Sequence, residues 1–387
     1  MRALLIVALA TVACTSPAPA IPTPTPTPER GVLTITALLD LSGPHASVGA
    51  QQRNALQLWV DQQPSPRTVP VKLRTVDVAG SDAKLLIELR RAAVDDPADA
   101  VIMGAPVTYD DTLGRAIGVA ALPVLFALPL ASDPAPRPGG RWTFALAPTL
   151  ASLASLEIDD ATRRGVLVPS LVLADQRGRI DPLANALGEE LRRRRLEPLT
   201  TIAVQADGTI PPVMRSSLSV LRSVHCTVLA SMCASVAEMA RSSGAPTLLY
   251  LSYLTTPADL SDHRELAARA MLPGTRTILP VFGFASGIDL ARQQFVRSYV
   301  ERNGAVGSQA AAAYDAMSLL AAAADRAGAD DRAALRDALE RITMPLIAST
   351  YSFAPDRHVG PDPEDLGYLR WNGSALAAAP GPGIPLR

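Results

Sequence analysis

The sequence has few aromatic residues and no surplus of charge of either sign. Phe, Trp and Tyr make up 4% of the 387 residues, and 36 Lys and Arg side chains face 37 Asp and Glu, for a formal net charge of −1. A nucleic-acid-binding protein would carry a basic surplus. A wholly disordered chain would have far fewer than the 48% hydrophobic residues found here. The composition therefore predicts a folded protein that binds no nucleic acid.

The motifs of enzyme active sites and metal centres are also missing. The four histidines are scattered, and no Cys stands at zinc-ligand spacing from them. The stretch "GFASG" (283–287) places its serine one position too late for a nucleophile elbow. The sequence contains neither a phosphate-binding loop nor a dinucleotide fingerprint. We therefore predict no enzyme, no metal site and no cofactor.

The N-terminus has the pattern of an export signal. Residues 1–13 hold a short basic start and an eleven-residue apolar run, which suits a signal peptide and is too short to span a bilayer. Small residues precede Cys14, so the segment resembles a bacterial lipoprotein signal in which Cys14 is lipidated, although Thr11 stands where Leu is usual. Residues 14–30 are rich in Pro and Thr and predict an extended tether. A secreted protein cleaved near this point is the alternative.

The other two cysteines lie close together in the sequence. Cys226 belongs to an apolar run that predicts a strand to Ser231, and Cys233 would begin the next helix. An extended chain of seven residues exceeds the Cα separation of roughly 7 Å that a disulfide allows. We therefore predict two buried thiols, and a disulfide only if the strand assignment is wrong.

Short apolar strands alternate with amphipathic helices along residues 34–251, in two series. This alternation predicts two doubly wound domains with parallel sheets covered on both faces. In the first series the predicted strands are Thr34–Leu39, Val69–Asp77, Ala100–Met103 and Pro123–Phe126, and the helices are Val48–Gln62, Asp82–Val94 and Asp110–Ala120. In the second the strands are Ser170–Ala174, Thr200–Val204, Cys226–Ser231 and Thr247–Leu251, and the helices are Leu150–Arg163, Asp181–Arg194, Pro211–Arg222 and Ser235–Ser242.

The C-terminal part breaks this alternation. Three consecutive helices are predicted at Gly287–Arg302, Ser308–Ala327 and Asp331–Ile342. A closing β-hairpin follows, and Asn372 and Gly373 form its turn.

Three segments resemble the branched-chain amino-acid-type periplasmic binding proteins, the type I solute-binding components of ABC importers. The first is "LSGPHASVGAQQRNALQLWVD" (41–61) after the first strand, the second is "AAAAYDAMSLLAAAADRAG" (310–328), and the third is "YSFAPDRHVGPDPEDLGYLRWNG" (351–373). Together the resemblance covers about residues 31–375. It implies an α/β fold of two doubly wound parallel-sheet lobes joined by three hinge crossings.

The resemblance also implies where the lobes begin and end. The first lobe would contain residues 31–147 and 278–343, and the second residues 148–277 and 344–387. The loops at the carboxyl ends of the strands would face the cleft between the lobes. In this family Tyr314 and Asp315 would be structural, and Asp315 would anchor a helix to a loop.

Loops of the first lobe supply several candidate ligand-binding residues. Ser42 and Gly43 can present a hydroxyl and backbone N–H groups to a carboxylate, and Thr108 fits the same role in the third loop. Tyr109 would stack on the ligand or lie on the surface, and Asp110 is the expected N-cap of the following helix. Leu128 stands where amino-acid-binding relatives usually have a hydroxyl residue, so it disfavours an amino acid as ligand.

The second lobe contributes the remaining candidates. Asp175 follows the first strand of this lobe in place of the family's Tyr-Gly. Ser231 would end a strand that faces the cleft. Tyr253 and Phe284 follow later strands. A ligand ammonium group would need a carboxylate, for which Asp175, Asp259 and Asp262 are unranked candidates.

These inferences combine into one functional prediction. The chain would be an extracytoplasmic, lipid-anchored, monomeric solute-binding protein of an ABC importer, whose partners are a membrane permease and a small solute: an amino acid, an amide or an organic acid. The lobes would close on the solute by hinge bending. A sensory or cell-envelope interaction lipoprotein of the same fold is the alternative.

Overall fold

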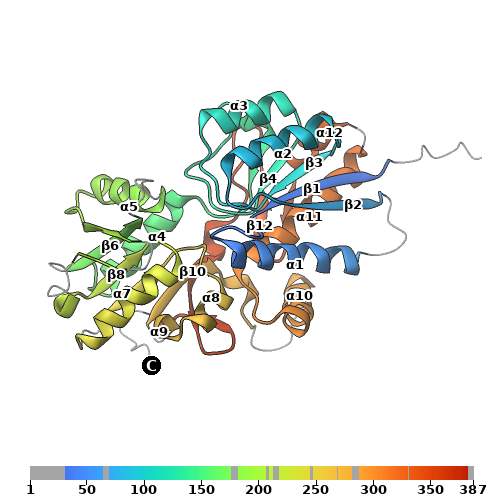
Figure 1. Cartoon of the computed structure of the whole chain (residues 1–387). Coiled ribbons are helices and arrows are strands. Elements are labelled where there is room, and N and C mark those ends of the chain that lie inside the picture. Colours follow the sequence, from blue (N-terminus) through green and yellow to red (C-terminus); the bar gives the residue numbers. More distant parts are fainter. Residues whose placement is uncertain are drawn as a thin grey trace, which may run out of the picture.

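The computed structural model describes residues 31–63, 69–175, 182–205, 209–211, 218–244, 247–267, 269–280, 287–329 and 331–381 (Figure 1). The predicted signal peptide, Cys14 and the tether lie outside the described residues. So do residues 212–217, half of the helix predicted at 211–222.

The first lobe is built on a five-stranded parallel sheet with the order β2-β1-β3-β4-β5. Strand β1 lies inside this sheet and is covered on both faces, which explains why its sequence LTITALL is almost continuously apolar. The strands are β1 (Leu33–Leu39), β2 (Val71–Asp77), β3 (Ala100–Met103), β4 (Val124–Phe126) and β5 (Thr143–Ala145).

Helices cover both faces of this sheet (Figure 1). On one face α1 (Ala46–Gln62) packs along α11 (Ser308–Ala327), whose many buried alanines allow a close approach. The other face carries α2 (Asp82–Val94) and α3 (Asp111–Ala120). Two further helices of this lobe are α10 (Gly287–Asn303) and α12 (Arg332–Leu339).

The second lobe is built on a seven-stranded sheet with the order β14-β13-β10-β9-β8-β6-β7. Strands β7, β6, β8, β9 and β10 run parallel. Strands β13 and β14 form the antiparallel hairpin predicted around Asn372 and Gly373, and β13 pairs antiparallel with β10. The strands are β6 (Ser170–Asp175), β7 (Thr200–Val204), β8 (Ser223–Cys226), β9 (Leu248–Leu251), β10 (Ala270–Thr275), β13 (Leu366–Trp371) and β14 (Leu376–Ala378).

The helices of this lobe also lie on both faces of the sheet. Val172 of β6 faces α4 (Leu150–Arg163) and α5 (Pro182–Arg193). Leu171 and Leu173 point to the other face. That face carries α7 (Ala230–Ser242), α8 (Pro257–Asp262) and α9 (Arg264–Ala267).

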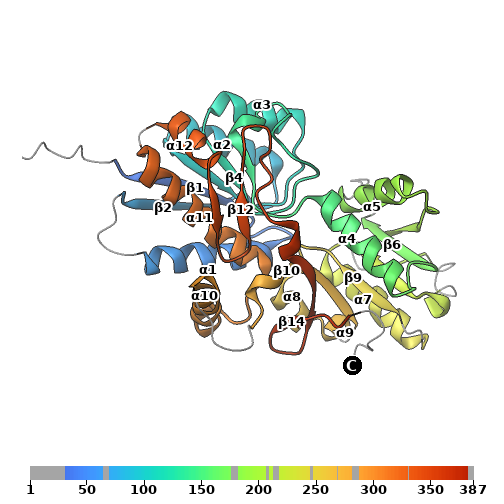
Figure 2. The same ribbon diagram turned by 180° about the vertical axis from the view of Figure 1, so that it is seen from behind.

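The chain passes between the lobes three times: after β5, after β10 and before β13. The predicted boundary at 344 needs a correction, because residues 344–362 pack with the first lobe (Figure 2). There β11 (Thr343–Pro345) pairs with β12 (Thr350–Ser352), and Val359 bridges to Ala145. The His358 ring nitrogen Nδ1 lies 2.8 Å from the carbonyl oxygen of Gly140.

Asp315 fastens α11 to the segment between β11 and β12. It is fully buried, and its carboxylate accepts the N–H groups of Ile347 and Ala348 at 2.9 and 2.6 Å. The Thr277 hydroxyl, from the passage after β10, donates to the carbonyl oxygen of Ile347 at 2.6 Å. The anchoring role predicted for Asp315 is confirmed. Burial raises the pKa of this carboxyl group to about 7, while the two N–H donors act in the opposite direction.

Candidate functional site

The loop between β1 and α1 folds around the carboxylate of Asp40. This side chain is fully buried and accepts the N–H groups of Gly43 at 2.8 Å and His45 at 3.1 Å. A Cβ atom on Gly43 would lie 2.1 Å from Asp40 Oδ1, so only glycine fits there. The Gly43 N–H, predicted to bind a ligand, therefore already binds Asp40.

Asp77, at the end of β2, holds the same loop from the neighbouring strand. Its carboxylate accepts hydrogen bonds from the Leu41 N–H at 2.9 Å, the Ala79 N–H at 2.9 Å and the Ser42 hydroxyl at 2.5 Å. The hydrogen bond from Ser42 is the main reason why the pKa of Asp77 falls to about 2. Ser42 is exposed at the rim, as its predicted role requires, but it donates its proton to Asp77.

The two residues predicted in the β3–α3 loop, Thr108 and Tyr109, differ in exposure. Thr108 is exposed, whereas Tyr109 is buried, packs edge-on against Phe126 and donates its hydroxyl to the carbonyl oxygen of Pro138 at 2.7 Å. Tyr109 is therefore a core residue, and both alternatives stated for it are wrong. The N-cap prediction for Asp110 is confirmed, because its side chain accepts the Leu113 N–H at 2.8 Å.

Leu128 and Tyr253 meet in an apolar cluster where the lobes touch. Both are buried, and they share this cluster with Val48 of α1 and Leu153 of α4. Burial raises the pKa of the Tyr253 hydroxyl. The structure thus brings these two predicted residues together at the lobe contact, although the sequence places them 125 positions apart.

The ligand-binding residues predicted in the second lobe are placed less fully by the structure. Asp175 is the last residue of β6, and its side chain lies outside the described part of the chain, as does Phe284. Ser231 does not end a strand, because β8 stops at Cys226 and Ser231 lies in the first turn of α7, where it is exposed.

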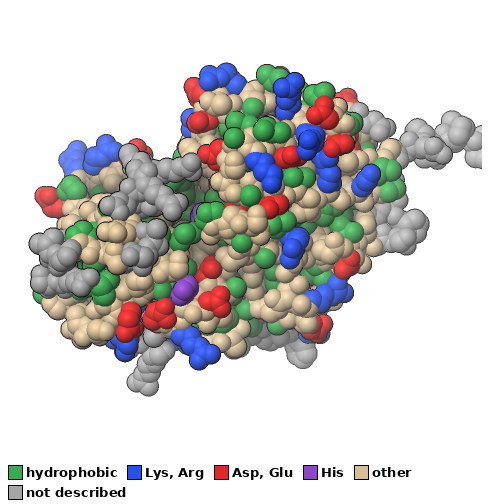
Figure 3. All heavy atoms as spheres, in the orientation of Figure 1, with side chains coloured by type: hydrophobic (Ala, Val, Ile, Leu, Met, Phe, Trp, Pro, Cys, Tyr) green, Lys and Arg blue, Asp and Glu red, His purple; other side chains and the backbone are tan. Residues whose placement is uncertain are grey.

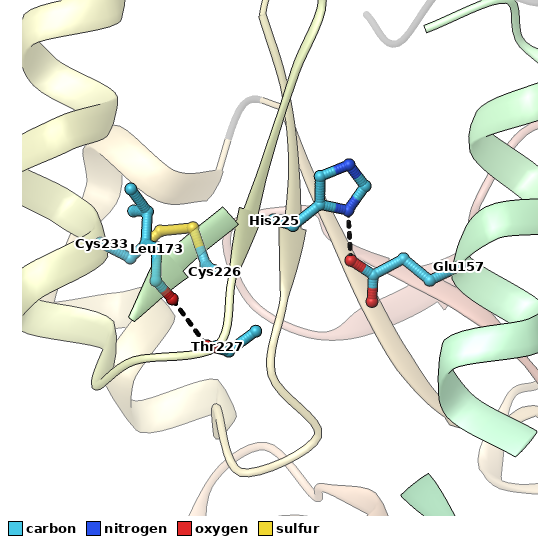
Figure 4. Close-up of a disulfide and its surroundings, with 6 residues drawn as sticks. All are labelled: Glu157, Leu173, His225, Cys226, Thr227 and Cys233. Atoms are coloured by element: carbon cyan, nitrogen blue, oxygen red, sulfur yellow. Dashed lines mark hydrogen bonds and ion pairs between the residues drawn. A yellow bond between two sulfur atoms is a disulfide. The ribbon is translucent and has the colours of Figure 1, made fainter. Parts of the chain in front are cut away.

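The early end of β8 also corrects the cysteine prediction. Cys226 closes the strand and Cys233 lies near the start of α7, so the chain folds back between them and their Cα atoms are 5.9 Å apart. They form a disulfide (Figure 4). The apolar run "HCTVLA" gave no signal that the strand ends after its second residue.

Two residues at the lobe contact, Ser47 and His45, were not among the predicted site residues. The hydroxyl of Ser47, in the first turn of α1, donates to Asp259 Oδ2 of α8 at 3.2 Å and so links the lobes. His45 lies beside this contact, and burial lowers the pKa of its imidazole despite the nearby carboxylates of Asp40 and Asp259. A polar loop before a helix was the only signal for them.

A buried glutamine lies at the carboxyl edge of the first sheet. Gln52 of α1 is fully buried, and neither its amide nitrogen nor its amide oxygen has a hydrogen-bond partner among the described residues. Its amide fills the space beside Gly104, the first residue after β3, where a Cβ would lie 2.4 Å from Gln52 Oε1. Buried polar groups without partners are uncommon and call for an explanation.

A Ser-His-Glu arrangement in the second lobe does not form an active site. His225 Nδ1 lies 2.5 Å from Glu157 Oε1, and Ser223 Oγ lies 3.3 Å from His225 Nε2. All three residues are buried in the core between β8 and α4, and the Ser223 hydroxyl donates to the carbonyl oxygen of Val166 at 2.8 Å (Figure 4 shows His225 and Glu157). The geometry resembles a hydrolase triad, but the serine proton is donated to Val166 and so not to His225, as nucleophile activation would require.

The described residues contain neither a metal centre nor a membrane span. No group of three or more His, Cys, Asp or Glu side chains is arranged there to hold a metal ion. Within the same residues, no helix is both long and apolar enough to cross a bilayer.

A hollow lies between the two lobes (Figure 3). Parallel sheets bind ligands at the carboxyl ends of their strands. The loops after β1, β3 and β4 of the first lobe lie at such ends, and so do those after β8 and β9 of the second. The hollow is therefore the candidate site.

Comparisons with known proteins agree with this arrangement. Residues 32–363 match the model of a family described as periplasmic binding protein. No curated protein matches the sequence. The structure is similar to an extracellular ligand-binding receptor from Rhodopseudomonas palustris HaA2, with 18% identity over 90% of this chain and 99% of that one and a TM-score of 0.72.

Two similar structures are described as binding branched-chain amino acids. One is the substrate-binding protein LivJ of Streptococcus pneumoniae in complex with isoleucine, with 15% identity, coverage of 90% and 98% and a TM-score of 0.69. The other is the leucine-binding protein LivK of Thermotoga maritima, with 15% identity, the same coverage and a TM-score of 0.68. At this identity the likeness shows the fold.

Proposed function

The chain belongs to the periplasmic binding protein family, in its type I, branched-chain amino acid form, and we propose that it is the extracytoplasmic solute receptor of an ABC importer. The family is one of solute-binding proteins located outside the cytoplasm. The observation that carries the proposal is the pair of parallel-sheet lobes whose strand ends face one hollow. The Cys226–Cys233 disulfide supports an oxidising compartment, because such bonds are rare in the cytosol.

The mechanism follows from the two lobes and makes or breaks no covalent bond. A solute enters between the open lobes, contacts loops of both, and shifts the population toward the closed form. The contacts proposed for the first lobe are Ser42, Gly43, Thr108 and Leu128. The second lobe would contribute Asp175, Ser231, Tyr253 and Phe284.

The partners of this cycle would be membrane proteins. The closed, loaded form would dock as a monomer on an ABC permease and release its solute there. Lipidation of Cys14 would hold the protein at the membrane, and the segment 14–30 would keep the lobes away from the surface. A sensory or cell-envelope interaction protein is the second candidate, favoured by Leu128, which replaces a ligand-binding hydroxyl with a side chain packed in the lobe contact.

A thermal-shift screen tests the proposal. The full chain, purified in mild detergent, is screened against amino acids, amides, short organic acids and polyamines. A solute that binds the folded state alone raises the melting temperature in proportion to the logarithm of its concentration. Such a solute supports a receptor. A flat response to every compound contradicts solute binding and favours the interaction protein, for which a protein partner should then be sought.

A further inference from the structure

Three backbone N–H groups and the serine hydroxyl of the first loop are already bound within the protein. The Asp40 carboxylate accepts hydrogen bonds from the N–H groups of Gly43 and His45. The Asp77 carboxylate accepts them from the Leu41 N–H and the Ser42 hydroxyl. A solute carboxylate needs such donors, and two protein carboxylates occupy the place where it would find them. A solute carboxylate would also be repelled by these charges.

The same pattern recurs where the two lobes meet. Ser47 donates its hydroxyl to Asp259, which also accepts the N–H and the hydroxyl of Thr256 at 2.8 and 2.9 Å. Ser42 and Ser47 therefore keep only their oxygen lone pairs for a solute, because each hydroxyl has a single proton. Among the described residues, no Lys or Arg side chain bonds to Asp40, Asp77 or Asp259.

Independent support comes from the amide of Gln52. It is fully buried at the carboxyl edge of the first sheet and lacks partners for both its donor and its acceptor among the described residues. A second amide offers the complementary pair of groups and would satisfy both at once. A Cβ atom on Gly104, the first residue after β3, would lie 2.4 Å from Gln52 Oε1, so the Gln52 amide lies directly against the backbone there.

We infer that the cleft takes a solute that donates hydrogen bonds through an amide or amine group and presents no carboxylate. The inference rests on the proposed solute-binding function and narrows its ligand class. In the cleft, Ser42 and Ser47 accept hydrogen bonds from the solute nitrogen, the three aspartates supply negative charge, and Gln52 pairs with the solute amide. The carboxylate of a free amino acid finds the backbone N–H groups of Leu41, Gly43 and His45 and the Ser42 hydroxyl already bound.

Matched acids and amides test this inference. Isobutyric acid and isobutyramide, and leucine and leucinamide, differ at one group and share their carbon skeletons. The melting temperature and Kd of the full chain in mild detergent are measured with each, alongside polyamines. We expect an amide or amine to raise the melting temperature and its matched acid to bind at least tenfold more weakly.

The outcomes separate the two proposals. Binding of an acid as tight as that of its amide overturns the inference and leaves the solute receptor standing. Binding confined to solutes that have neither an amide nor an amine also overturns the inference and leaves the solute receptor standing. If no solute binds at all, the proposed function fails and the inference fails with it.

The variant Gln52→Met tests the buried amide directly. We expect it to weaken the amide solute at least tenfold while the melting temperature without solute stays equal or rises, because the variant removes a buried polar group that has no partner. Gln57→Met is the control, since Gln57 is exposed on the same helix and bonds to Asp61. A Gln52→Met protein with a lower melting temperature and an unchanged Kd would make Gln52 a packing residue and contradict its pairing with the solute.

Discussion

Ser42 donates its hydroxyl proton to the carboxylate of Asp77 across 2.5 Å, and the two residues lie 35 positions apart in the sequence. The contact turns a residue that could donate to a carboxylate into one that can only accept. It also links the loop after β1 to the end of β2. Whether this loop can donate a hydrogen bond to a solute therefore depends on a residue of the neighbouring strand.

Replacing Asp77 should change this preference. In Asp77→Ala the Ser42 hydroxyl and the N–H groups of Leu41 and Ala79 lose their acceptor and become available to a solute. We expect the preference for an amide over its matched acid to fall about tenfold, which is about 1.4 kcal/mol. The measurement is the ratio of the two Kd values. Asp96→Ala removes an equal charge from an exposed ion pair with Arg74 and should leave the ratio unchanged; an equal change in both variants would mean that net charge is the cause.

Glycine at position 43 should be required for the loop. In Gly43→Ala the new Cβ meets Asp40 Oδ1, so the loop must move and lose the hydrogen bonds to that carboxylate. We expect the free energy of unfolding to fall by about 1–3 kcal/mol, measured by urea denaturation. Gly188 lies in helix α5 with open space around it, so Gly188→Ala should raise the free energy of unfolding by about 0.5–1 kcal/mol. A neutral Gly43→Ala would show that the loop is not held as described.

The buried carboxyl of Asp315 should make stability depend on pH. Its pKa is about 7 in the folded protein and 3.8 in a free side chain. The folded state therefore holds the proton more strongly, so its stabilising contribution is complete below pH 4, is lost between about pH 4 and 7, and stays constant above. A pKa difference of about 3 corresponds to about 4 kcal/mol.

Asp315→Asn should remove this dependence. The free energy of unfolding of the variant minus that of the natural protein should rise between pH 4 and 7 and level off above, as measured by urea denaturation at each pH. Asp111→Asn, an exposed carboxyl group of α3, is the control and should give a flat difference. A flat difference for Asp315→Asn as well would mean that the carboxyl group ionises inside the protein without cost.

Loss of the disulfide should destabilise the second lobe. The bond closes a loop of seven residues between β8 and α7, and the chain-entropy relation assigns such a loop about 2–3 kcal/mol. We expect the double variant Cys226→Ala with Cys233→Ala to unfold more easily by that amount, and a reducing agent to lower the melting temperature of the natural protein but not of the variant. A reductant that acts equally on both would indicate that the cysteines are not bonded.

Much of the fold could be predicted from local patterns. The bounds of α2, α4 and α11 agree with the predicted ranges, because each has a clear apolar period and, for α2 and α4, a capping hydroxyl at Ser81 or Thr149. Strand β8 was predicted too far along the chain because its apolar run continues into α7. Strand β10 was missed, since Pro273 and Gly274 interrupt it.

The candidate site was predicted less well, for a physical reason. Loop positions at strand ends follow from the alternation of elements, which is why Ser42 and Gly43 lie in the loop after β1 and Thr108 in the loop after β3. Their partners come from distant parts of the chain: Asp77 from the next strand, Asp259 from the other lobe. A sequence does not reveal whether a serine proton points to solvent or to a carboxylate, and that direction decides the ligand.

The peptide at 347–348 is held from two sides. Asp315 accepts hydrogen bonds from its N–H groups, and the hydroxyls of Thr275 and Thr277 donate to its carbonyl oxygens. The connection that follows β10 is therefore fixed to the first lobe at this peptide, beside helix α11. Twisting one lobe against the other would stretch these bonds, whereas rotation about a line through them would not. The protein should thus move as a one-axis joint, and its open and closed forms should differ by a single angle.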